Sequence, residues 1–520
     1  MAEPASQRPK YNPTPCISPL DHTPLHETNG KTWVPLICCS AGFPQDLFET
    51  ALEQLVHHPE YNSTLILRSD CLSETTEDFP DSIPALDGFT PSRCIHRKLL
   101  PRRPGRDAAL EQYCTFYCAP SDHIPSVLVL TPIIPDSGSL PYYHPAVSHL
   151  AFRYITSAIG RGAATSVSDS GATPASGTAT TSVDEPAATL RLEVDPLPSQ
   201  PTTDITSPDV NSRLYRTGLA LLETAHRYGW GALTQYKKRV HHDCLVPREP
   251  YQDLYLVMRA RHRHLVDEWQ ESTDPLKHVF EDIGIATYLM LLWRYTFGDE
   301  TRAEDEQAEA LDSEPCGNGL LTHILVSEGY AGHGFDVRAR VSWSHYPPAT
   351  QQNLHVHALD PTSAADDALI PRGAFLIGNH ADELTPWVPI LATRQRSSGY
   401  ISVPCCAWAF DTKYQRSRWA PYPTPEGFVE GLNLGGGGAV ASSGYSMYRV
   451  WLASLSLHCG WDVETEALRI PSTRNWAIVG RKRVVGKDEE GSSNVEGILD
   501  EVRERGAFNA RVPEGKAGEH

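Results

Sequence analysis

The sequence predicts an α/β protein with more than one domain. The chain has 520 residues, which is long for a single domain, and 40% of them are hydrophobic, enough for sizeable cores. Apolar runs typical of strands and of helices alternate in residues 33–70 and again in residues 316–483, as in a sheet covered by helices. Residues 161–210, between these regions, are rich in Ser, Thr, Ala, Gly and Pro. Such a composition predicts a disordered linker.

The N-terminal part, residues 1–160, is predicted to be an α/β region of unknown role. Three runs in it have the composition of strands and a fourth has the apolar spacing of an amphipathic helix; the strands are residues 33–39, 63–70 and 126–134, and the helix is residues 44–58. The pattern of this region indicates no particular chemistry.

Residues 211–300 follow the linker and show helical periodicity. Between residues 237 and 264 there are seven Lys and Arg against three Asp and Glu, in a chain whose formal net charge is −19. Lys237, Lys238 and Arg239 are adjacent. This local excess of positive charge fits either a solvated helix face or a surface that contacts phosphates. The overall acidity argues against a protein that coats nucleic acid without specificity.

The apolar runs and the cysteines indicate the cellular location of the protein and whether it binds a metal. No apolar run reaches the roughly 18 residues of a membrane span, and the N-terminus lacks the apolar stretch of a signal peptide. These features place the protein in the cytosol or nucleus, and we expect a cytoplasmic protein with no membrane association. The twelve cysteines are scattered and form no C-x-x-C pair, so we expect structural thiols and no bound metal.

A candidate cofactor loop lies in residues 316–340, CGNGLLTHILVSEGYAGHGFDVRAR. Gly317 and Gly319 flank Asn318 just before an apolar-periodic helix, and Asp336 ends a strand-like run nineteen residues after Gly317. Glycines before a helix let a ligand approach the backbone, and an acid at that spacing suits ribose hydroxyls. The pattern indicates an adenosine-containing cofactor. The alternative is an ordinary strand–helix turn with a surface aspartate.

A second candidate site is the stretch FLIGNHADELTPW, residues 375–387. Asn379, His380 and Asp382 follow a short apolar run that reads as a buried strand. Ligands of open α/β sheets bind beyond the carboxyl ends of the strands, so we expect these side chains beside the cofactor. The alternative is that Asp382 only caps the next helix.

These two stretches, together with VPCCAW, LRIPSTRNW, KRVHHDCLVP and TDPLKHVFEDIGIATYLMLLW, resemble the eukaryotic tRNA (uracil-2′-O)-methyltransferases that act on uridine 44 of serine tRNA. The likeness runs from about Leu214 to Arg483. It implies that residues 301–486 form a class I (Rossmann-like) S-adenosylmethionine-dependent methyltransferase sheet, preceded by the helical segment. It also implies S-adenosylmethionine as donor and tRNA, with serine tRNA expected, as partner.

The resemblance assigns roles to individual residues. Cofactor binding falls to six of them: Cys316, Gly317, Asn318, Gly319, Asp336 and Asn379. His380 and Asp382 would face the reacting methyl group. Cys405, Cys406 and Lys413 would follow the next strand, where Lys413 could lower the pKa of the ribose hydroxyl. Arg474 would reach an RNA phosphate.

One segment departs from the family pattern. Ser313, Glu314 and Pro315 stand where an apolar strand and a glycine are expected, so we predict that residues 303–314 form no central strand. This departure keeps open a non-catalytic RNA-binding protein with a degenerate donor site. A methyltransferase for proteins or small molecules is disfavoured by the basic helices. Residues 487–520 are predicted to form a polar, flexible tail.

Overall fold

The computed structural model describes residues 8–506 and residue 508, apart from 17–22, 121, 135–138, 157–187, 198–209, 237–241, 299–309, 316 and 433–442. The chain divides into two compact units, Met1–Lys237 and Lys238–His520. No helix among the described residues is long and apolar enough to cross a membrane.

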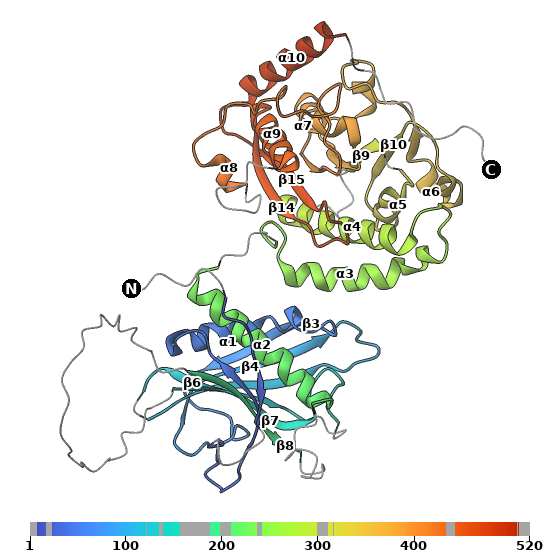
Figure 1. Cartoon of the computed structure of the whole chain (residues 1–520). Helices are drawn as coiled ribbons and strands as arrows, with labels where there is room; N and C mark the ends of the chain where they lie inside the picture. Colours follow the sequence, from blue (N-terminus) through green and yellow to red (C-terminus); the bar gives the residue numbers. More distant parts are fainter. Residues whose placement is uncertain are drawn as a thin grey trace, which may run out of the picture. The chain divides into compact units, whose positions relative to one another are not determined.

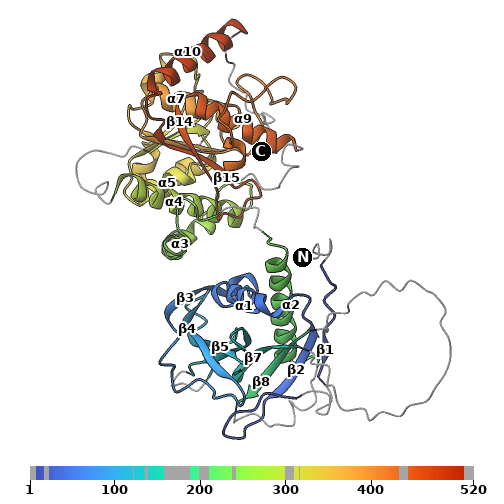
Figure 2. The ribbon, with the colours of Figure 1, turned by 90° about the vertical axis from the view of Figure 1, so that its left-hand side faces the viewer.

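The first unit is an antiparallel sheet with two helices on one face (Figures 1 and 2). Its strand order is β1-β2-β8-β7-β6-β5-β4-β3. The strands are β1 Thr14–Pro15, β2 Val34–Ser40, β3 Ile66–Thr75, β4 Thr90–Pro101, β5 Leu110–Cys118, β6 Pro125–Pro132, β7 Val147–Ile155 and β8 Thr189–Pro196. The helices are α1 Phe48–His57 and α2 Arg213–Leu233, which pack on each other and on the sheet.

Two elements of this unit correct the expected boundaries. β8 lies inside the stretch predicted to be a disordered linker, where Leu190, Leu192 and Val194 alternate into the core and the strand pairs with β2 and β7. The prediction rests on the average composition of residues 161–210, in which the eight residues of this strand carry little weight. α2 belongs to this sheet and not to a separate helical segment, because Leu222 and Ala225 pack in the core beneath it.

The second unit is a seven-stranded sheet of order β11-β10-β9-β12-β13-β15-β14. The strands are β9 Ala310–Pro315, β10 Gly332–Asp336, β11 Leu354–Val356, β12 Phe375–Asn379, β13 Gly399–Val403, β14 Trp461–Ala467 and β15 Trp476–Arg483. The pairs among β9, β10, β11, β12 and β13 are parallel, and β15 is antiparallel to both of its neighbours. The unit is therefore of mixed α/β type.

Helices cover both faces of this sheet. Phe375 and Ile377 of β12 point to the core shared with α3, α4 and α5, whereas Leu376 points to the core of α7, α9 and α10. Figure 1 shows α3 and α4 side by side. The helices are α3 Arg248–His262, α4 Pro275–Phe297, α5 Leu320–Ser327, α6 Pro348–Gln351, α7 Val388–Arg394, α8 Phe428–Gly431, α9 Gly444–His458 and α10 Asp488–Glu504.

Strand β9 shows that the prediction of no central strand over residues 303–314 is wrong. It pairs with β10 on one side, Gly332 opposite Ala310, and with β12 on the other, Phe375 opposite Ala310. The ladder joins backbone groups, and every residue except proline supplies both an N–H and a carbonyl whatever its side chain. A register shift then brings Phe335 opposite Pro315. Residues 303–309 lie outside the described part.

Helix α10 is a further difference, because it lies in the predicted flexible tail. Val495, Ile498, Leu499 and Val502 are each at most 4% exposed and pack in the same core as α7 and α9. Their spacing is that of one helix face, embedded in an otherwise polar sequence.

Candidate active site

The two candidate loops follow neighbouring parallel strands at the point where the winding of the sheet reverses. From β9 the chain proceeds outward through β10 to β11, and from β12 it proceeds in the opposite direction to β13, while β9 and β12 are parallel neighbours. The crevice beyond the carboxyl ends of two such strands is the usual ligand site of an open α/β sheet. Residues 317–319 follow β9, and residues 380–382 follow β12.

The turn after β9 requires its glycines. Gly317 and Gly319 have φ of +52° and +71°, a region that side chains disfavour. A Cβ on Gly319 would also lie 3.0 Å from the Leu354 side chain and 3.1 Å from Nε1 of Trp343. The Asn318 side chain accepts a hydrogen bond from the Leu320 N–H at 2.9 Å and so supports the first turn of α5.

Two aromatic side chains from the segment after β10 donate hydrogen bonds to carbonyls of the glycine turn. Nε1 of Trp343 donates to the Gly317 carbonyl at 3.0 Å, and the Tyr346 hydroxyl donates to the Asn318 carbonyl at 2.9 Å. The Tyr346 ring stacks on the ring of His323 of α5. Sequence reasoning missed Trp343 and Tyr346, since no local pattern connects them to a turn more than twenty residues earlier.

Asp336 lies against the glycine turn, as its spacing suggested. Its carboxylate is buried, with 2% of the residue exposed. Oδ2 accepts a hydrogen bond from the Gly317 N–H and Oδ1 accepts one from the Arg338 N–H, both at 3.0 Å. Nη2 of Arg340 is 4.0 Å from Oδ2. A buried carboxylate at the end of β10 is thus fixed beside the backbone of the turn.

The loop after β12 has a strained backbone. His380 and Asp382 have φ of +62° and +42°, although neither is glycine. A left-handed conformation costs such residues about 1–2 kcal/mol each. Asp382 begins a 3₁₀ helix, Asp382–Trp387, whose N-cap is Ala381, and neither that helix nor α7 has a side-chain cap. Asp382 is therefore not the N-cap residue of either helix. Strain of this kind is typical of functional loops.

His380 is held neutral by its surroundings. The residue is exposed, yet the protein around the imidazole partly desolvates it, and this lowers its pKa below the ordinary value. Glu281 and Asp382 act in the opposite direction, while His278 and Lys277 lower the pKa further. Three of these residues, Lys277, His278 and Glu281, come from the first turns of α4 and were not singled out in the sequence. Only the fold brings α4 to this loop.

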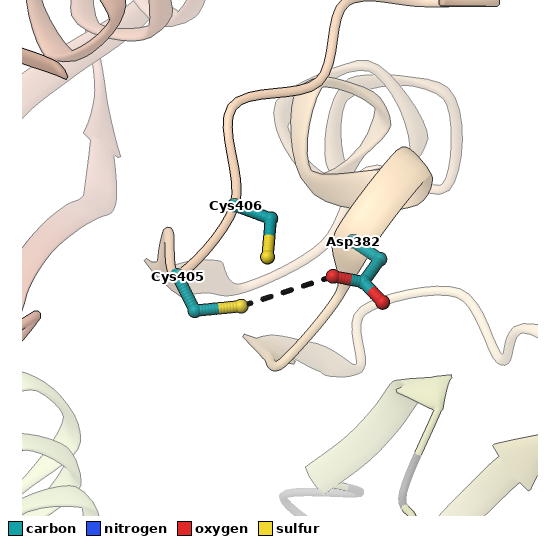
Figure 3. A group of neighbouring side chains, drawn as sticks. All are labelled: Asp382, Cys405 and Cys406. Atoms are coloured by element: carbon teal, nitrogen blue, oxygen red, sulfur yellow. Dashed lines mark hydrogen bonds between the residues drawn. The ribbon is translucent and has the colours of Figure 1, made fainter. Parts of the chain in front are cut away.

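Two adjacent cysteines face Asp382 from the end of β13 (Figure 3). The Cys405 thiol donates a long hydrogen bond of 3.9 Å to Oδ1 of Asp382. Burial, the neighbouring Cys406 and the Asp382 charge raise the pKa of Cys405 to about 12. Burial and the hydrogen bond and charge of Asp382 also raise the pKa of Cys406. Both thiols are therefore protonated at neutral pH.

Of the cations expected at the site, Arg474 and Lys413 lie among the described residues. The Arg474 guanidinium donates to the Cys405 carbonyl and lies 4.8 Å from the centre of the Tyr445 ring, at the edge of this loop cluster. Lys413 is exposed, with its ammonium 5.8 Å from the centre of the Trp408 ring. Cys316, Lys237, Lys238 and Arg239 lie outside the described residues.

Comparisons with known proteins identify two domains in this chain. Residues 10–239 match the family model "TRM44-like, N-terminal bet v1-like domain", and residues 245–361 match "Predicted AdoMet-dependent methyltransferase". The first match spans the antiparallel unit, and the second spans α3 to β11, including the glycine turn and Asp336. No solved structure matches the chain.

Curated relatives cover nearly the whole chain. The tRNA (uracil-O(2)-)-methyltransferase of Schizosaccharomyces pombe is 33% identical over 93% of this chain and 91% of its own length. The enzymes of the same name from Neurospora crassa and Saccharomyces cerevisiae are 33% and 28% identical, over 87% and 88% of this chain and 87% and 86% of their own lengths. This chain belongs to the tRNA (uracil-O(2)-)-methyltransferase family.

Proposed function

We propose that this chain transfers a methyl group from S-adenosylmethionine to the 2′-hydroxyl of a uridine in tRNA, namely uridine 44 of serine tRNA. The observation that carries the proposal is the strained loop with His380 and Asp382, set beside the glycine turn at the point where the sheet reverses. The order of β11, β10, β9, β12 and β13 corresponds to 3-2-1-4-5 of doubly wound sheets, which supports a Rossmann-like unit.

The residues around the turn fit an adenosine-containing donor. The buried Asp336 carboxylate is an acceptor suited to ribose hydroxyls. Val356, its register partner on β11, is 59% exposed and offers an apolar surface to a purine at the same end of the sheet. Asn379 ends β12 on the other side of β9. When bound, S-adenosylmethionine supplies the activated methyl group.

The chain's own contribution is to orient the acceptor hydroxyl and remove its proton. Asp382 bears a partly exposed carboxylate on the loop, and His380 is neutral and can also accept a proton. The Lys413 ammonium lies against the Trp408 ring and makes no hydrogen bond or ion pair with the loop among the described residues, so we give it no part in the proton transfer. We therefore assign the proton transfer to Asp382 with His380, and the main effect to orientation.

Two groups of cations would hold the tRNA. Arg474 is exposed next to the Cys405 carbonyl, so it can reach a phosphate beside the loop. Lys237, Lys238 and Arg239 stand where the two units join in the sequence. A ribose hydroxyl is accessible in the shallow groove of RNA or in a distorted segment, and either geometry needs phosphate contacts to fix its position.

A second candidate is a non-catalytic RNA-binding protein. One observation favours it: a proline, Pro315, ends β9 just before the glycine turn. Binding of S-adenosylmethionine, measured by calorimetry, separates the candidates.

The methyl-transfer proposal is tested with the purified chain, labelled S-adenosylmethionine and serine tRNA transcripts. We expect one ribose methyl group per tRNA, mapped to uridine 44, and none when that uridine is replaced by 2′-deoxyuridine. Donor binding without transfer to any tRNA would contradict the proposal. Transfer to a different uridine would retain the chemistry and overturn the assigned position.

A further inference from the structure

The group formed by Asp382, Cys405 and Cys406 has a composition that the proposed methyl transfer does not require. We propose that these three side chains form a site for a thiophilic divalent cation such as Zn²⁺, and that the bound cation inhibits the enzyme by occupying Asp382. The inhibitory part rests on the proposed function, whereas the site itself stands on the geometry. Sequence reasoning expected no metal, because the two cysteines form no C-x-x-C pair.

The ligand atoms are already gathered. One oxygen of Asp382 and the two thiol sulfurs all lie within 4.8 Å of one another, and the Cys405 sulfur is 3.9 Å from Oδ1 of Asp382. Ligand atoms around one tetrahedral zinc are separated by about 3.3–3.8 Å, as bond lengths of 2.0–2.3 Å require. Side-chain rotations that move the ligand atoms by about 1 Å would therefore bring them to the separations of a zinc site. Figure 3 shows the three side chains converging from two loops.

Soft sulfur ligands select the kind of cation. Two thiolates favour Zn²⁺, Cd²⁺ or Co²⁺ over Mg²⁺ and Ca²⁺, which prefer oxygen. Three protein ligands leave a fourth position for water or a substrate atom. All three side chains are at least partly accessible to solvent, so a cation can enter.

The charge balance is consistent with cation binding. A free cysteine thiol is ordinarily protonated at neutral pH, so the metal-free pair of cysteines carries two protons. Binding of Zn²⁺ would release these two protons to solvent and leave two thiolates and one carboxylate around the ion. A second cluster of possible ligands, Glu27, His149 and Asp195, differs in this respect. There the Lys31 ammonium lies 2.6 Å from the Asp195 carboxylate and already supplies the positive charge.

The expected consequence follows from the role proposed for Asp382. A carboxylate that ligates a cation is a much weaker base, so it cannot take the proton of the ribose hydroxyl. The ion would also stand close to the position of the acceptor. Zn²⁺ should therefore reversibly reduce methyl transfer, and a chelator should restore it.

The site is tested first without tRNA or donor, so that the result is independent of catalysis. Co²⁺ is added to the reduced full-length chain and the thiolate-to-cobalt charge-transfer absorption is recorded, followed by displacement with Zn²⁺. We expect one equivalent of tight binding and a proton release that calorimetry detects in buffers of different ionisation enthalpy. Cys405→Ser, Cys406→Ser and Asp382→Asn should each weaken Zn²⁺ binding by roughly tenfold or more, since losing a ligand costs at least as much as losing an outer-shell contact.

The matched control is Cys71→Ser, which removes an exposed thiol from β3 of the other unit. It should leave Co²⁺ absorption and Zn²⁺ affinity unchanged. Thermal unfolding of every variant without metal checks that the fold is retained. Absence of the charge-transfer band, or equal loss of it in Cys71→Ser, would overturn the site.

The inhibitory role is tested by the ratio of single-turnover rates with and without Zn²⁺ within each protein. The ratio should fall in the unaltered chain and in Cys71→Ser, and stay close to one in the Cys405→Ser/Cys406→Ser double variant. If Zn²⁺ bound tightly and left the single-turnover rate unchanged, the inhibitory role would be overturned and the site retained. The same would hold if a chelator lowered the rate. A chain that binds Zn²⁺ but never methylates tRNA would contradict the proposed function alone.

Discussion

The Asp336 carboxylate accepts a hydrogen bond from the backbone N–H of Gly317 at 3.0 Å, so the end of β10 is tied to the turn that follows β9. The second carboxylate oxygen is bonded to the Arg338 N–H. The acid is thus oriented in advance at the place where we propose that the donor ribose binds.

Replacing Asp336 with Ala should weaken S-adenosylmethionine binding by tenfold or more. Hydrogen bonds to a charged group contribute roughly 1.5–3 kcal/mol each, and a ribose offers two hydroxyls. Calorimetry measures the affinity, and tRNA binding, measured by filter retention, should be unaffected. Asp336→Asn keeps the side-chain volume and one acceptor, so its loss should be smaller. Equal donor affinity in all three proteins would return Asp336 to a purely structural role.

Asp382→Asn should spare donor binding and lower the single-turnover rate by on the order of a hundredfold, the usual contribution of a general base. Glu383→Gln is the matched control, because it changes the neighbouring carboxylate of the same loop. That control should keep the rate within a few fold. If Asp382→Asn transferred methyl groups at the full rate, orientation alone would account for catalysis.

Methyl transfer should persist below the pH at which an ordinary histidine becomes charged. Burial lowers the pKa of His380 from its ordinary 6.5, so the ring remains neutral and able to accept a proton until the pH falls through that lowered value. A plot of single-turnover rate against pH should therefore decline only below 6.5. In His380→Ala this acid limb should be lost or shifted. An identical profile in the variant would assign the limb to another group.

Neutralising Lys237, Lys238 and Arg239 should weaken tRNA binding and leave donor affinity unchanged. Each lost phosphate contact should flatten the dependence of log affinity on log salt by about one unit of slope. Arg474→Ala should act in the same way at a single contact. Titrations at several salt concentrations measure the slope. Unaltered slopes would indicate that these cations only solvate the surface.

The first unit should lose stability in acid through His144, which is 7% exposed. Its ring bonds Gln112 and the Pro145 carbonyl, and burial lowers its pKa to about 4. Between the ordinary value of 6.5 and about 4, the unfolded chain takes up a proton that the folded chain does not. The free energy of unfolding should therefore fall by about 3 kcal/mol as pH drops through this window.

Urea unfolding of the full chain at pH 7 and pH 4 measures this effect. His144→Gln should reduce the pH-dependent loss, because glutamine does not titrate. His123→Gln, at an exposed position, is the control and should retain the loss. The same loss in His144→Gln would place the responsible group elsewhere.

The sequence by itself determined the parts of this protein that rest on local patterns. The strand β12 lies where its short apolar run predicted, and the amphipathic helix α1 lies where its apolar spacing predicted, because both patterns are local properties of the sequence. The Gly317–Gly319 turn and Asp336 were also identified from local sequence, since glycine is needed at positive φ and the spacing reflects one strand–helix–strand unit.

The tertiary structure alone decided the rest, because it depends on neighbours distant in sequence. β9 exists because β10 and β12 offer their backbone groups on both sides, and its own side chains gave no signal for it. Glu281 of α4 acts on His380, and the Cys405 thiol bonds Asp382, across 99 and 23 residues of sequence. Such contacts arise only when packing brings separate elements together, so no local pattern predicts them.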